Sequence, residues 1–357
     1  MHGQRGDDRR GRHASARARR ARRSLPRGLF PGADRRGALA RSGAGARVNT
    51  STLRELLGRH GLHLSRDLGQ NFLTDADLAV DLARRAGARQ GDFVIEVGTG
   101  LGVLTRALAG IADRVRTVEI DAGLVRALEA ESLLPENVEL VHADAREIDW
   151  RGWIAEAQGR PVRLIANLPY SVATPLLRTM LDLRGELADW SVMIQTEVAE
   201  RLVAEPGERA YGSLTVLHRL AADVDTIAKV APSRFFPQPK VDSSFVRVWP
   251  RAKSPLQAGE LAAVERLTRA AFGQRRKRVT NGLSRIAERA FPGLEKPARR
   301  EALEARLNEV GIDPALRPER IEPEAWLALA RAFAGDDLGP AQGDEGNGSD
   351  AAAVADG

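Results

Sequence analysis

The fold of this chain is decided by Phe93-Val94-Ile95-Glu96-Val97-Gly98-Thr99-Gly100-Leu101-Gly102. The apolar run at its start is typical of a buried strand, and the alternating glycines let the backbone turn sharply into a helix while passing close to a ligand. A dinucleotide-binding loop has the spacing G-x-G-x-x-G, whose third small residue would fall at Val103 in this chain. The observed spacing, G-x-G-x-G, favours a nucleoside ligand that carries no phosphates.

Short apolar runs alternate with helical stretches on both sides of this loop. Besides Phe93–Val97, strands are expected at Val115–Ile120, Val138–Val141, Val162–Ala166, Ser191–Ile194 and Phe245–Trp249. Helical periodicity is found at Leu78–Ala86, Val103–Leu108, Leu124–Leu128, Pro175–Leu183 and Thr196–Ala204. The alternation predicts an α/β fold, in which helices cover both faces of a sheet.

The pattern changes after Pro250 and Pro255, which bracket a short polar linker. No strand-like run follows this linker, and residues 259–334 are expected to form four or five helices. We therefore predict a sheet domain over residues 49–252 and a smaller, all-helical domain over residues 253–335.

The net charge of +6 is unevenly distributed along the 357 residues. Residues 1–48 carry +11, residues 336–357 carry −6, and residues 49–335 carry only +1. Both terminal segments are rich in small residues and in charges of one sign, and are expected to be disordered. The N-terminal segment has three interpretations: an RNA-binding arm, an organelle transit peptide, or an upstream stretch that is not translated in the cell. On the rest of the chain, a nucleic-acid surface requires local clusters of basic residues.

The residue content excludes several kinds of site. The chain has no cysteine, which excludes disulfides, thiolate metal sites and a cysteine nucleophile. Among six histidines only His60 and His63 have a spacing that suits a metal, and no third ligand accompanies them, so no metal is expected. No apolar stretch is long enough for a transmembrane helix, and Pro26 and Arg27 interrupt the N-terminal segment where a signal peptide needs an apolar run. These features predict a soluble, cytoplasmic protein.

Acidic residues follow the two strands after the glycine-rich loop. Glu119 lies 21 residues after Gly98, where an acid can accept hydrogen bonds from both hydroxyls of a ribose. Asp144 follows the next strand, and it either accepts from the amino group of an adenine or caps the N-terminus of a helix. The loop, Glu119 and Asp144 together fit S-adenosylmethionine as the ligand.

The strand expected at Val162–Ala166 is followed by Asn167-Leu168-Pro169-Tyr170. An amide oxygen, a main-chain carbonyl and an aromatic ring at one strand end suit a planar base with an exocyclic amine. If Asn167 and the Leu168 carbonyl each accept one amine hydrogen, the nitrogen lone pair is drawn out of the ring and can attack a methyl group. Tyr170 would stack on a flipped-out base, and Phe235 is the candidate for its opposite face. The alternatives are an ordinary strand-to-loop turn for the motif and a core position for Phe235.

Five motifs, in their order along the chain, resemble the small-subunit branch of the ribosomal RNA adenine N6,N6-dimethyltransferase family. Besides the glycine-rich loop and Asn167–Tyr170, they are Leu68-Gly69-Gln70-Asn71-Phe72-Leu73, Pro237-Gln238-Pro239-Lys240-Val241-Asp242-Ser243 and Ala271-Phe272-Gly273-Gln274-Arg275-Arg276-Lys277. The resemblance implies a Rossmann-like class I S-adenosylmethionine-dependent methyltransferase sheet with a smaller all-helical C-terminal domain. It also implies a cofactor pocket lined by Asn71, Leu73, Gly98, Glu119, Asp144 and Asn167.

The resemblance further implies a substrate. Members of the family dimethylate two adjacent adenosines near the 3′ end of small-subunit (16S) ribosomal RNA, late in the assembly of that subunit. The expected partner is an immature small ribosomal subunit, bound by a monomeric enzyme. Arg275, Arg276, Lys277, Arg278 and Lys240 are expected to contact RNA phosphates, and Arg247 extends the same surface. A solvated charged face is the alternative for this run.

Other functions stay open at this point. An enzyme of the same build can act on large-subunit ribosomal RNA or on DNA adenine, and a ribosome-assembly or transcription factor can keep the fold without catalysis. A nicotinamide dehydrogenase fits the glycine spacing poorly. Two positions depart from the family pattern: Thr99 stands where many members have Pro, and Glu322 where a Ser commonly caps the last helix. Neither is a proposed catalytic group.

Overall fold

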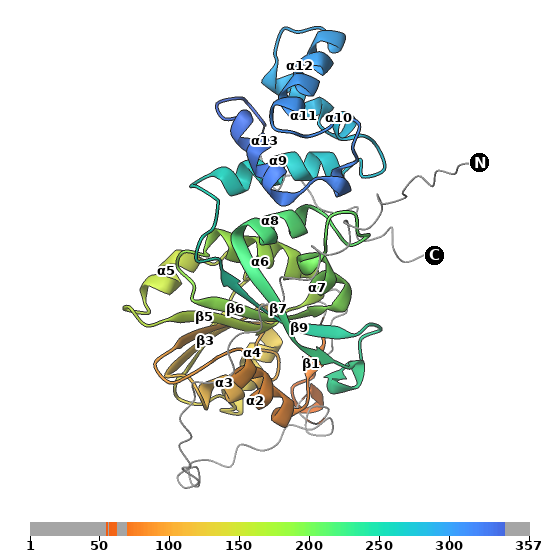
Figure 1. The fold of residues 1–357 in the computed structure, drawn as a ribbon. Helices are drawn as coiled ribbons and strands as arrows, with labels where there is room; N and C mark the ends of the chain where they lie inside the picture. Colours follow the sequence, from red (N-terminus) through yellow and green to blue (C-terminus); the bar gives the residue numbers. More distant parts are fainter. Residues whose placement is uncertain (1–54, 56, 63–69, 340–357) are drawn as a thin grey trace, which may run out of the picture. The chain divides into compact units, whose positions relative to one another are not determined.

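A mixed sheet of seven strands forms the centre of the computed structural model, which describes residues 55, 57–62 and 70–339 (Figure 1). The strands lie in the order β4-β3-β2-β5-β6-β9-β7. The first five are parallel, and β9 pairs antiparallel with both of its neighbours, β6 and β7. Their bounds are β2 Phe93–Val97, β3 Arg114–Glu119, β4 Val138–His142, β5 Val162–Asn167, β6 Asp189–Gln195, β7 Ala222–Val230 and β9 Ser243–Pro250.

The chain runs outward from β2 to β4 and then returns to the other side of β2 to form β5. This reversal opens a crevice at the carboxyl ends of β2 and β5, which is where open α/β sheets bind ligands. The connecting helices are α2 Ala76–Arg85, α3 Val103–Ala109, α4 Ala122–Ala130, α5 Trp150–Ala155, α6 Tyr170–Asp182, α7 Thr196–Val203 and α8 Ser213–Ala221.

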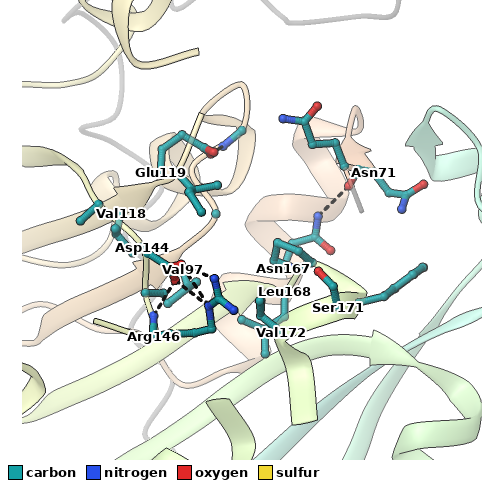
Figure 2. A pocket seen from close by; sticks show the side chains of 18 of the residues that line it. Asn71, Val97, Val118, Glu119, Asp144, Arg146, Asn167, Leu168, Ser171 and Val172 are labelled. Atoms are coloured by element: carbon teal, nitrogen blue, oxygen red, sulfur yellow. Dashed lines mark hydrogen bonds and ion pairs between the residues drawn. The ribbon is translucent and has the colours of Figure 1, made fainter. Parts of the chain in front are cut away.

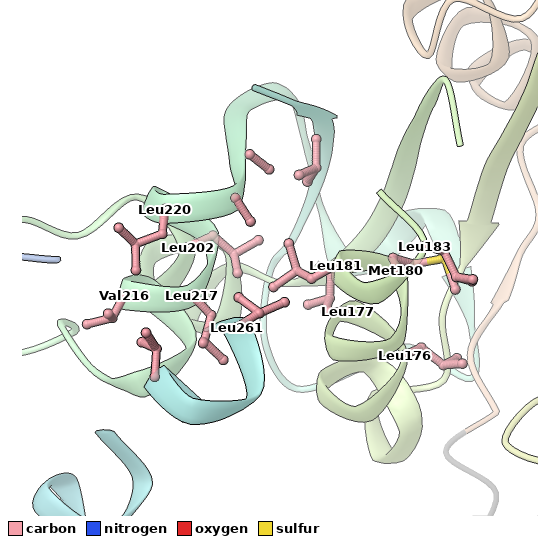
Figure 3. Close-up of a cluster of buried hydrophobic side chains, with 14 of the residues drawn as sticks. Leu176, Leu177, Met180, Leu181, Leu183, Leu202, Val216, Leu217, Leu220 and Leu261 are labelled. Atoms are coloured by element: carbon pink, nitrogen blue, oxygen red, sulfur yellow. The ribbon is translucent and has the colours of Figure 1, made fainter. Parts of the chain in front are cut away.

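Alternate side chains of each central strand enter two different hydrophobic clusters, one on each face of the sheet. In β2, Phe93 and Ile95 join the cluster under α6 and α8, whereas Val94 joins the cluster under α2 and α3. Figure 3 shows Leu177 and Leu181 of α6 pointing toward Leu202 of α7, Leu217 of α8 and Leu261 in the first of these clusters. Burial on both faces explains why the parallel strands appear in the sequence as continuous apolar runs.

Every element described after Pro250 is helical. The helices are α9 Glu260–Phe272, α10 Val279–Gly282, α11 Ser284–Ala290, α12 Lys296–Glu309 and α13 Pro323–Ala332, with a short 3₁₀ helix η2 at Pro318–Arg320. Residues of α9 and α13 share a hydrophobic cluster with α6 and α8, so the packing is continuous between the sheet and these helices. The division into domains at residue 252 stays a prediction.

All six predicted strands are present, with ends within two residues of the expected ones. The predicted start of the helix at Pro175 was wrong, because α6 begins at Tyr170 and contains Pro175. The patterns also missed the edge strand β7, the helices α5 and α8, and a two-stranded ribbon in which β1 (Phe72–Leu73) pairs with β8 (Phe235–Phe236). The predictions for residues 1–48 and 340–357 lie outside the described residues. Within the part of the chain that is described, no helix has the length and apolarity needed to cross a membrane.

Candidate active site at the carboxyl ends of the strands

A cavity of about 270 Å³ lies at the carboxyl ends of β2, β3, β4 and β5 (Figure 2). Parallel strands end at the same edge of a sheet, so residues far apart in the sequence meet there. The cavity brings together eight of the predicted site residues: Asn71, Gly98, Glu119, Asp144, Asn167, Leu168, Pro169 and Tyr170. Of the other predicted residues, Leu73 and Phe235 do not line it.

The glycine-rich loop forms one wall of this cavity. Gly98, Gly100 and Gly102 have φ angles of 80°, 54° and 69°, in the left-handed region that L side chains rarely adopt. A Cβ atom on Gly100 would also lie 2.7 Å from the ring of Phe72, so the loop needs glycine there to pack against the N-terminal motif. Thr99, which departs from the family pattern, is held by a 2.7 Å hydrogen bond between its hydroxyl and that of Thr117.

Glu96 lies buried beneath the loop. The hydroxyls of Thr105 and Thr117 donate to its Oε2 at 2.6 and 2.8 Å. Burial raises the pKa of Glu96 from its usual 4.5 to about 8, and the nearby Glu119 carboxylate adds to this rise. No role was predicted for Glu96, although an acid inside a buried apolar strand is itself a signal.

Glu119 accepts hydrogen bonds from the two elements that flank it. The Gly100 N–H donates to Oε2 at 2.8 Å, and the Asp121 N–H donates to Oε1 at 3.0 Å. Burial raises the pKa of Glu119, while these two N–H groups act to lower it. Each carboxylate oxygen keeps a further lone pair, so the side chain can still accept from two ribose hydroxyls.

Asp144 is paired with Arg146, which also lines the cavity. The backbone N–H of Arg146 donates to Asp144 Oδ1 at 2.8 Å, and its guanidinium donates to both carboxylate oxygens. These hydrogen bonds lower the pKa of Asp144. The alternative of a helix N-cap was wrong, because α5 begins at Trp150 and is capped by Asp149. Figure 2 shows Arg146 reaching back over Asp144 inside the cavity.

Asn167 ends β5 with its amide held in one orientation. Its Nδ2 donates to the Asn71 carbonyl at 3.0 Å, which leaves Oδ1 as the free end of the amide. Among the described residues, no donor contacts Asn167 Oδ1 or the Leu168 carbonyl oxygen. The motif is a strand-to-helix junction, with Pro169 at the N-cap position of α6. Two adjacent acceptors therefore stand at the cavity without partners from the described part of the chain.

Tyr170 is half-buried, and its hydroxyl lies 3.0 Å from the Ser243 hydroxyl. Burial raises the pKa of this phenol, so it remains protonated at neutral pH. The contact joins the Asn167–Tyr170 motif to the end of the Pro237–Ser243 motif. The sequence did not predict this contact, because the two motifs are more than 60 residues apart.

Phe235 and Leu73 pair with each other across the β1–β8 ribbon. Both side chains belong to the core, with 5% and 4% of their surface exposed. Leu73 lines a small side cavity together with Gly98 and Asn167. The position of Phe235 fits its core interpretation, and its stacking role stays a prediction that requires the ring to leave this position.

The predicted RNA-binding residues fall into two groups. Arg276, Lys277, Arg278 and Lys240 are exposed. Arg275 instead holds the structure together: its guanidinium donates to Glu319 at 2.8 Å, to the Tyr211 carbonyl at 2.8 Å and to the Glu208 carbonyl at 2.9 Å. Arg247 is likewise bonded, to Asp189 at 3.1 Å. The phosphate contacts of Arg275 and the extension of that surface by Arg247 stay predictions, and in this arrangement both guanidinium groups bond within the protein.

Among the described residues, no group of three His, Asp or Glu side chains could hold a metal ion. His60 lies 3.1 Å from Glu131. The second histidine of that predicted pair, His63, lies outside the described residues.

Known proteins resemble this chain in sequence and fold. Residues 61–306 match the family model for ribosomal RNA adenine dimethylase. The chain is 40% identical over 287 residues to ribosomal RNA small subunit methyltransferase A of Azorhizobium caulinodans, covering 79% of this chain and 92% of that protein. It is 36% identical over 280 residues to the protein of the same name from Levilactobacillus brevis, covering 78% and 93%.

Two solved structures share the fold. A dimethyladenosine transferase from Plasmodium falciparum has a TM-score of 0.60 at 24% identity, covering 74% of this chain and 97% of that chain. The 23S rRNA methyltransferase ErmE has a TM-score of 0.53 at 27% identity, covering 74% and 100%. The mixed sheet with flanking helices is thus the Rossmann-like methyltransferase fold. The extent of the sequence match shows that this chain belongs to the ribosomal RNA adenine dimethylase family.

Proposed function

We propose that this protein transfers methyl groups from S-adenosylmethionine to the N6 amines of two adjacent adenosines near the 3′ end of small-subunit ribosomal RNA. The observation that carries the proposal is the Asn167 amide, which is fixed through its nitrogen by the Asn71 carbonyl and lines the cavity together with its neighbour Leu168. Two neutral acceptors side by side match the two hydrogens of an exocyclic amine.

The cavity fits the adenosyl part of S-adenosylmethionine, which supplies an activated methyl group when bound. Glu119 is the candidate acceptor for both ribose hydroxyls, and Asp144 for the adenine amino group. Val97, Val118 and Ile120 provide apolar walls for a flat ring, and Ile120 is 43% exposed although its side chain is large and apolar. The glycine-rich loop lets the backbone approach the ligand closely.

The protein's own contribution to the reaction is alignment of the amine. The nitrogen of an aromatic amine is a poor nucleophile because its lone pair is delocalised into the ring. Hydrogen bonds from the amine to Asn167 Oδ1 and to the Leu168 carbonyl oppose this delocalisation and aim the lone pair into the cavity. Neither acceptor is a strong base, so water takes the proton that the amine releases. Holding both reactants in this geometry is itself a large part of catalysis.

Tyr170 is the candidate residue to hold the ring of the flipped-out adenosine. Its hydroxyl contact with Ser243 fixes one edge of the side chain. Stacking of a base on an aromatic residue is worth about 1–3 kcal/mol, which offsets part of the cost of unstacking the adenosine from the RNA.

The small subunit is favoured over other targets by the relatives. Proteins named for the small subunit match over more than nine tenths of their length at 36–40% identity, whereas ErmE, a 23S rRNA methyltransferase, matches at 27%. The complete set of acceptors speaks against a purely non-catalytic assembly factor. We further propose that the protein acts as a monomer in the cytoplasm, on immature small subunits late in their assembly.

The test is transfer of labelled methyl groups to three acceptors: undermodified small subunits, large subunits and duplex DNA. Label should enter the small subunits alone, in N6,N6-dimethyladenosine. The variant Asn167→Ala should lose about 10²–10³-fold in kcat, the usual cost of removing one preorganised hydrogen-bonding group at a reacting centre, and should still bind subunits. Asn308→Ala, at an exposed position of α12, is the matched control. Undiminished methyl transfer by Asn167→Ala would show that the proposed mechanism is wrong.

A further inference from the structure

A second cavity lies between α9 and α11, away from the residues proposed to act on the adenosine. It has a volume of about 610 Å³, more than twice that of the cavity at the strand ends. Four arginines line it: Arg266 and Arg269 from α9, and Arg285 and Arg289 from α11.

The local sequence explains why the four guanidinium groups converge. Arg285 and Arg289 are four residues apart and lie on one face of α11, and Arg266 and Arg269 are three residues apart on α9. The chain enters α11 close to α9 because Gly282, the last residue of α10, sits against α9, where a Cβ atom would lie 2.7 Å from the Ala271 Cα. The arrangement is therefore built into the packing of these helices.

The acids near these arginines are already engaged. Glu265, which is buried in the wall, is bonded to Arg178 and lies 2.9 Å from Arg269. Glu288 lies 3.5 Å from Arg299. Within the described part of the chain, Arg266, Arg285 and Arg289 form no ion pair.

One of these three arginines is also partly withdrawn from solvent. Arg266 Nε is buried and has no hydrogen-bond partner among the described residues. A buried, unpaired N–H of a charged group is costly unless an anion binds it. The cavity thus combines positive charge that no acid of the described residues neutralises with an unsatisfied donor, and both features favour an anionic ligand.

The position of the cavity identifies the kind of anion. Gly273 and Gln274 line its rim and directly precede the basic run Arg275–Arg278, of which Arg276, Lys277 and Arg278 are exposed. The exposed cations therefore follow the rim of the cavity by two to four residues along the chain, at the end of α9. Guanidinium groups bind phosphate through paired N–H···O bonds, and RNA presents phosphates at regular intervals.

We propose that this cavity binds a backbone phosphate of the ribosomal RNA substrate, held by Arg266, Arg285 and Arg289. The proposal rests on the proposed function and adds to it an anchor that is separate from the adenosine site. The site fixes the position of the RNA on the helical part of the protein, while Asn167 and Tyr170 hold the reacting base.

The test measures binding of undermodified small subunits over a series of KCl concentrations, comparing wild type with Arg285→Gln/Arg289→Gln. Loss of one phosphate contact should weaken binding by about tenfold near 0.1 M salt and reduce the slope of log K against log salt by about 0.7–0.9. The affinity for S-adenosylmethionine and the methylation rate at saturating subunit should not change. The control is Arg160→Gln/Arg300→Gln, which removes the same charge from two exposed positions outside the cavity.

Unchanged subunit binding and an unchanged salt slope in Arg285→Gln/Arg289→Gln would overturn the proposal. The rival occupant is the acidic segment after Gly339, since Leu338 also lines the cavity. If that segment fills the site, deleting residues 340–357 tightens RNA binding, and the substitutions do not weaken it in the full-length chain; this result also overturns the proposal. The two proposals can fail separately. If the wild type does not methylate subunits, the proposed function is wrong; if the substitutions still reduce the salt slope of binding, the phosphate site is nevertheless supported.

Discussion

The two ends of the parallel strands place their polar side chains in opposite surroundings. At the amino ends, Arg163 is buried between Asp92 and Asp189, with its Nε 2.7 Å from Asp92, and Arg247 bonds to the same Asp189. At the carboxyl ends, Glu119 and Asn167 face a cavity. Among the described residues Glu119 has no cationic partner, whereas Asp144 at the same edge is paired with Arg146.

The difference separates a stabilising cluster from a binding site. The amino-end cluster neutralises itself, so it has no need of a ligand. At the carboxyl ends, Glu119 is buried without a partner of opposite charge, and its pKa is raised by that burial. Perturbed carboxylates in a cavity are a physical sign of function, and the same residues in a closed ion-pair cluster are not.

The largest effect is expected from breaking the amino-end cluster with Arg163→Met. This change leaves Asp92 and Asp189 buried without their shared cation and should lower the free energy of unfolding by about 3–5 kcal/mol, as removal of one partner from a buried ion pair does. Urea unfolding followed by circular dichroism measures the loss. Arg151→Met, which breaks the exposed pair with Glu186, should cost less than about 1 kcal/mol. Equal losses in the two variants would contradict the contrast drawn between buried and exposed pairs.

The corresponding change at the carboxyl ends is Glu119→Gln. It removes the charge that strengthens the hydrogen bonds to ribose, each worth about 1.5–3 kcal/mol, and should raise the Kd for S-adenosylmethionine by about 10–100-fold. The free energy of unfolding should change by no more than about 2 kcal/mol, because removing a buried charge is favourable whereas the Gln amide nitrogen can no longer accept from the Gly100 or the Asp121 N–H. Isothermal titration calorimetry and urea unfolding separate the two effects. An unaltered Kd would remove Glu119 from the cofactor site.

Glu96 should make stability depend on pH. Its pKa is about 8 in the folded chain against a usual 4.5, so the folded state holds an extra proton between these values. The stability that this proton provides is complete below about pH 4.5 and is lost as the pH rises through 8, by at most about 1.4 kcal/mol per pH unit. The difference in unfolding free energy between wild type and Glu96→Gln should therefore shift in favour of the variant from pH 5 to pH 9. A difference that is constant with pH would show that Glu96 does not titrate in this way.

The smallest effect is expected from Arg146→Ala. The side chain of Arg146 is 61% exposed, so its pair with Asp144 contributes less than about 1 kcal/mol, and removing it frees the carboxylate for the adenine amino group. The Kd for S-adenosylmethionine should fall by a factor of up to about five, which corresponds to that energy. Calorimetry on Arg146→Ala and on Arg126→Ala, an exposed position of α4, tests this. Weaker binding in Arg146→Ala would mean that Arg146 contacts the cofactor instead of covering its site.

Many of the residues that line the cavity could be predicted from the sequence, because the ends of buried strands can be predicted from it. Continuous apolar runs mark buried parallel strands, and residues at their carboxyl ends must meet at one edge. This reasoning predicts that Glu119, Asp144 and Asn167 lie at one edge of the sheet, and all three line the cavity. The same reasoning predicted the ends of the strands to within two residues, since each apolar run ends where the strand leaves the core.

The features that sequence did not predict depend on contacts between distant segments. The β1–β8 ribbon has two residues in each strand, too few for any periodicity, and is defined only by the pairing of Phe72 with Phe236. Arg275 looked like a member of a basic run, but Glu319, 44 residues away, holds it. Arg146 follows Asp144 by two residues, yet only the turn between them shows that the two side chains pair.

The central claim is that the open acceptors at the carboxyl ends of the strands serve to dimethylate small-subunit ribosomal RNA. The most direct measurement is mass spectrometry of small-subunit RNA from cells with and without this protein, and from cells that carry only Asn167→Ala. N6,N6-dimethyladenosine at two adjacent positions near the 3′ end should be present with the wild type, absent without the protein and strongly reduced with Asn167→Ala alone. Dimethyladenosine that persists at both positions without the protein, or at the wild-type level with Asn167→Ala alone, would contradict the claim.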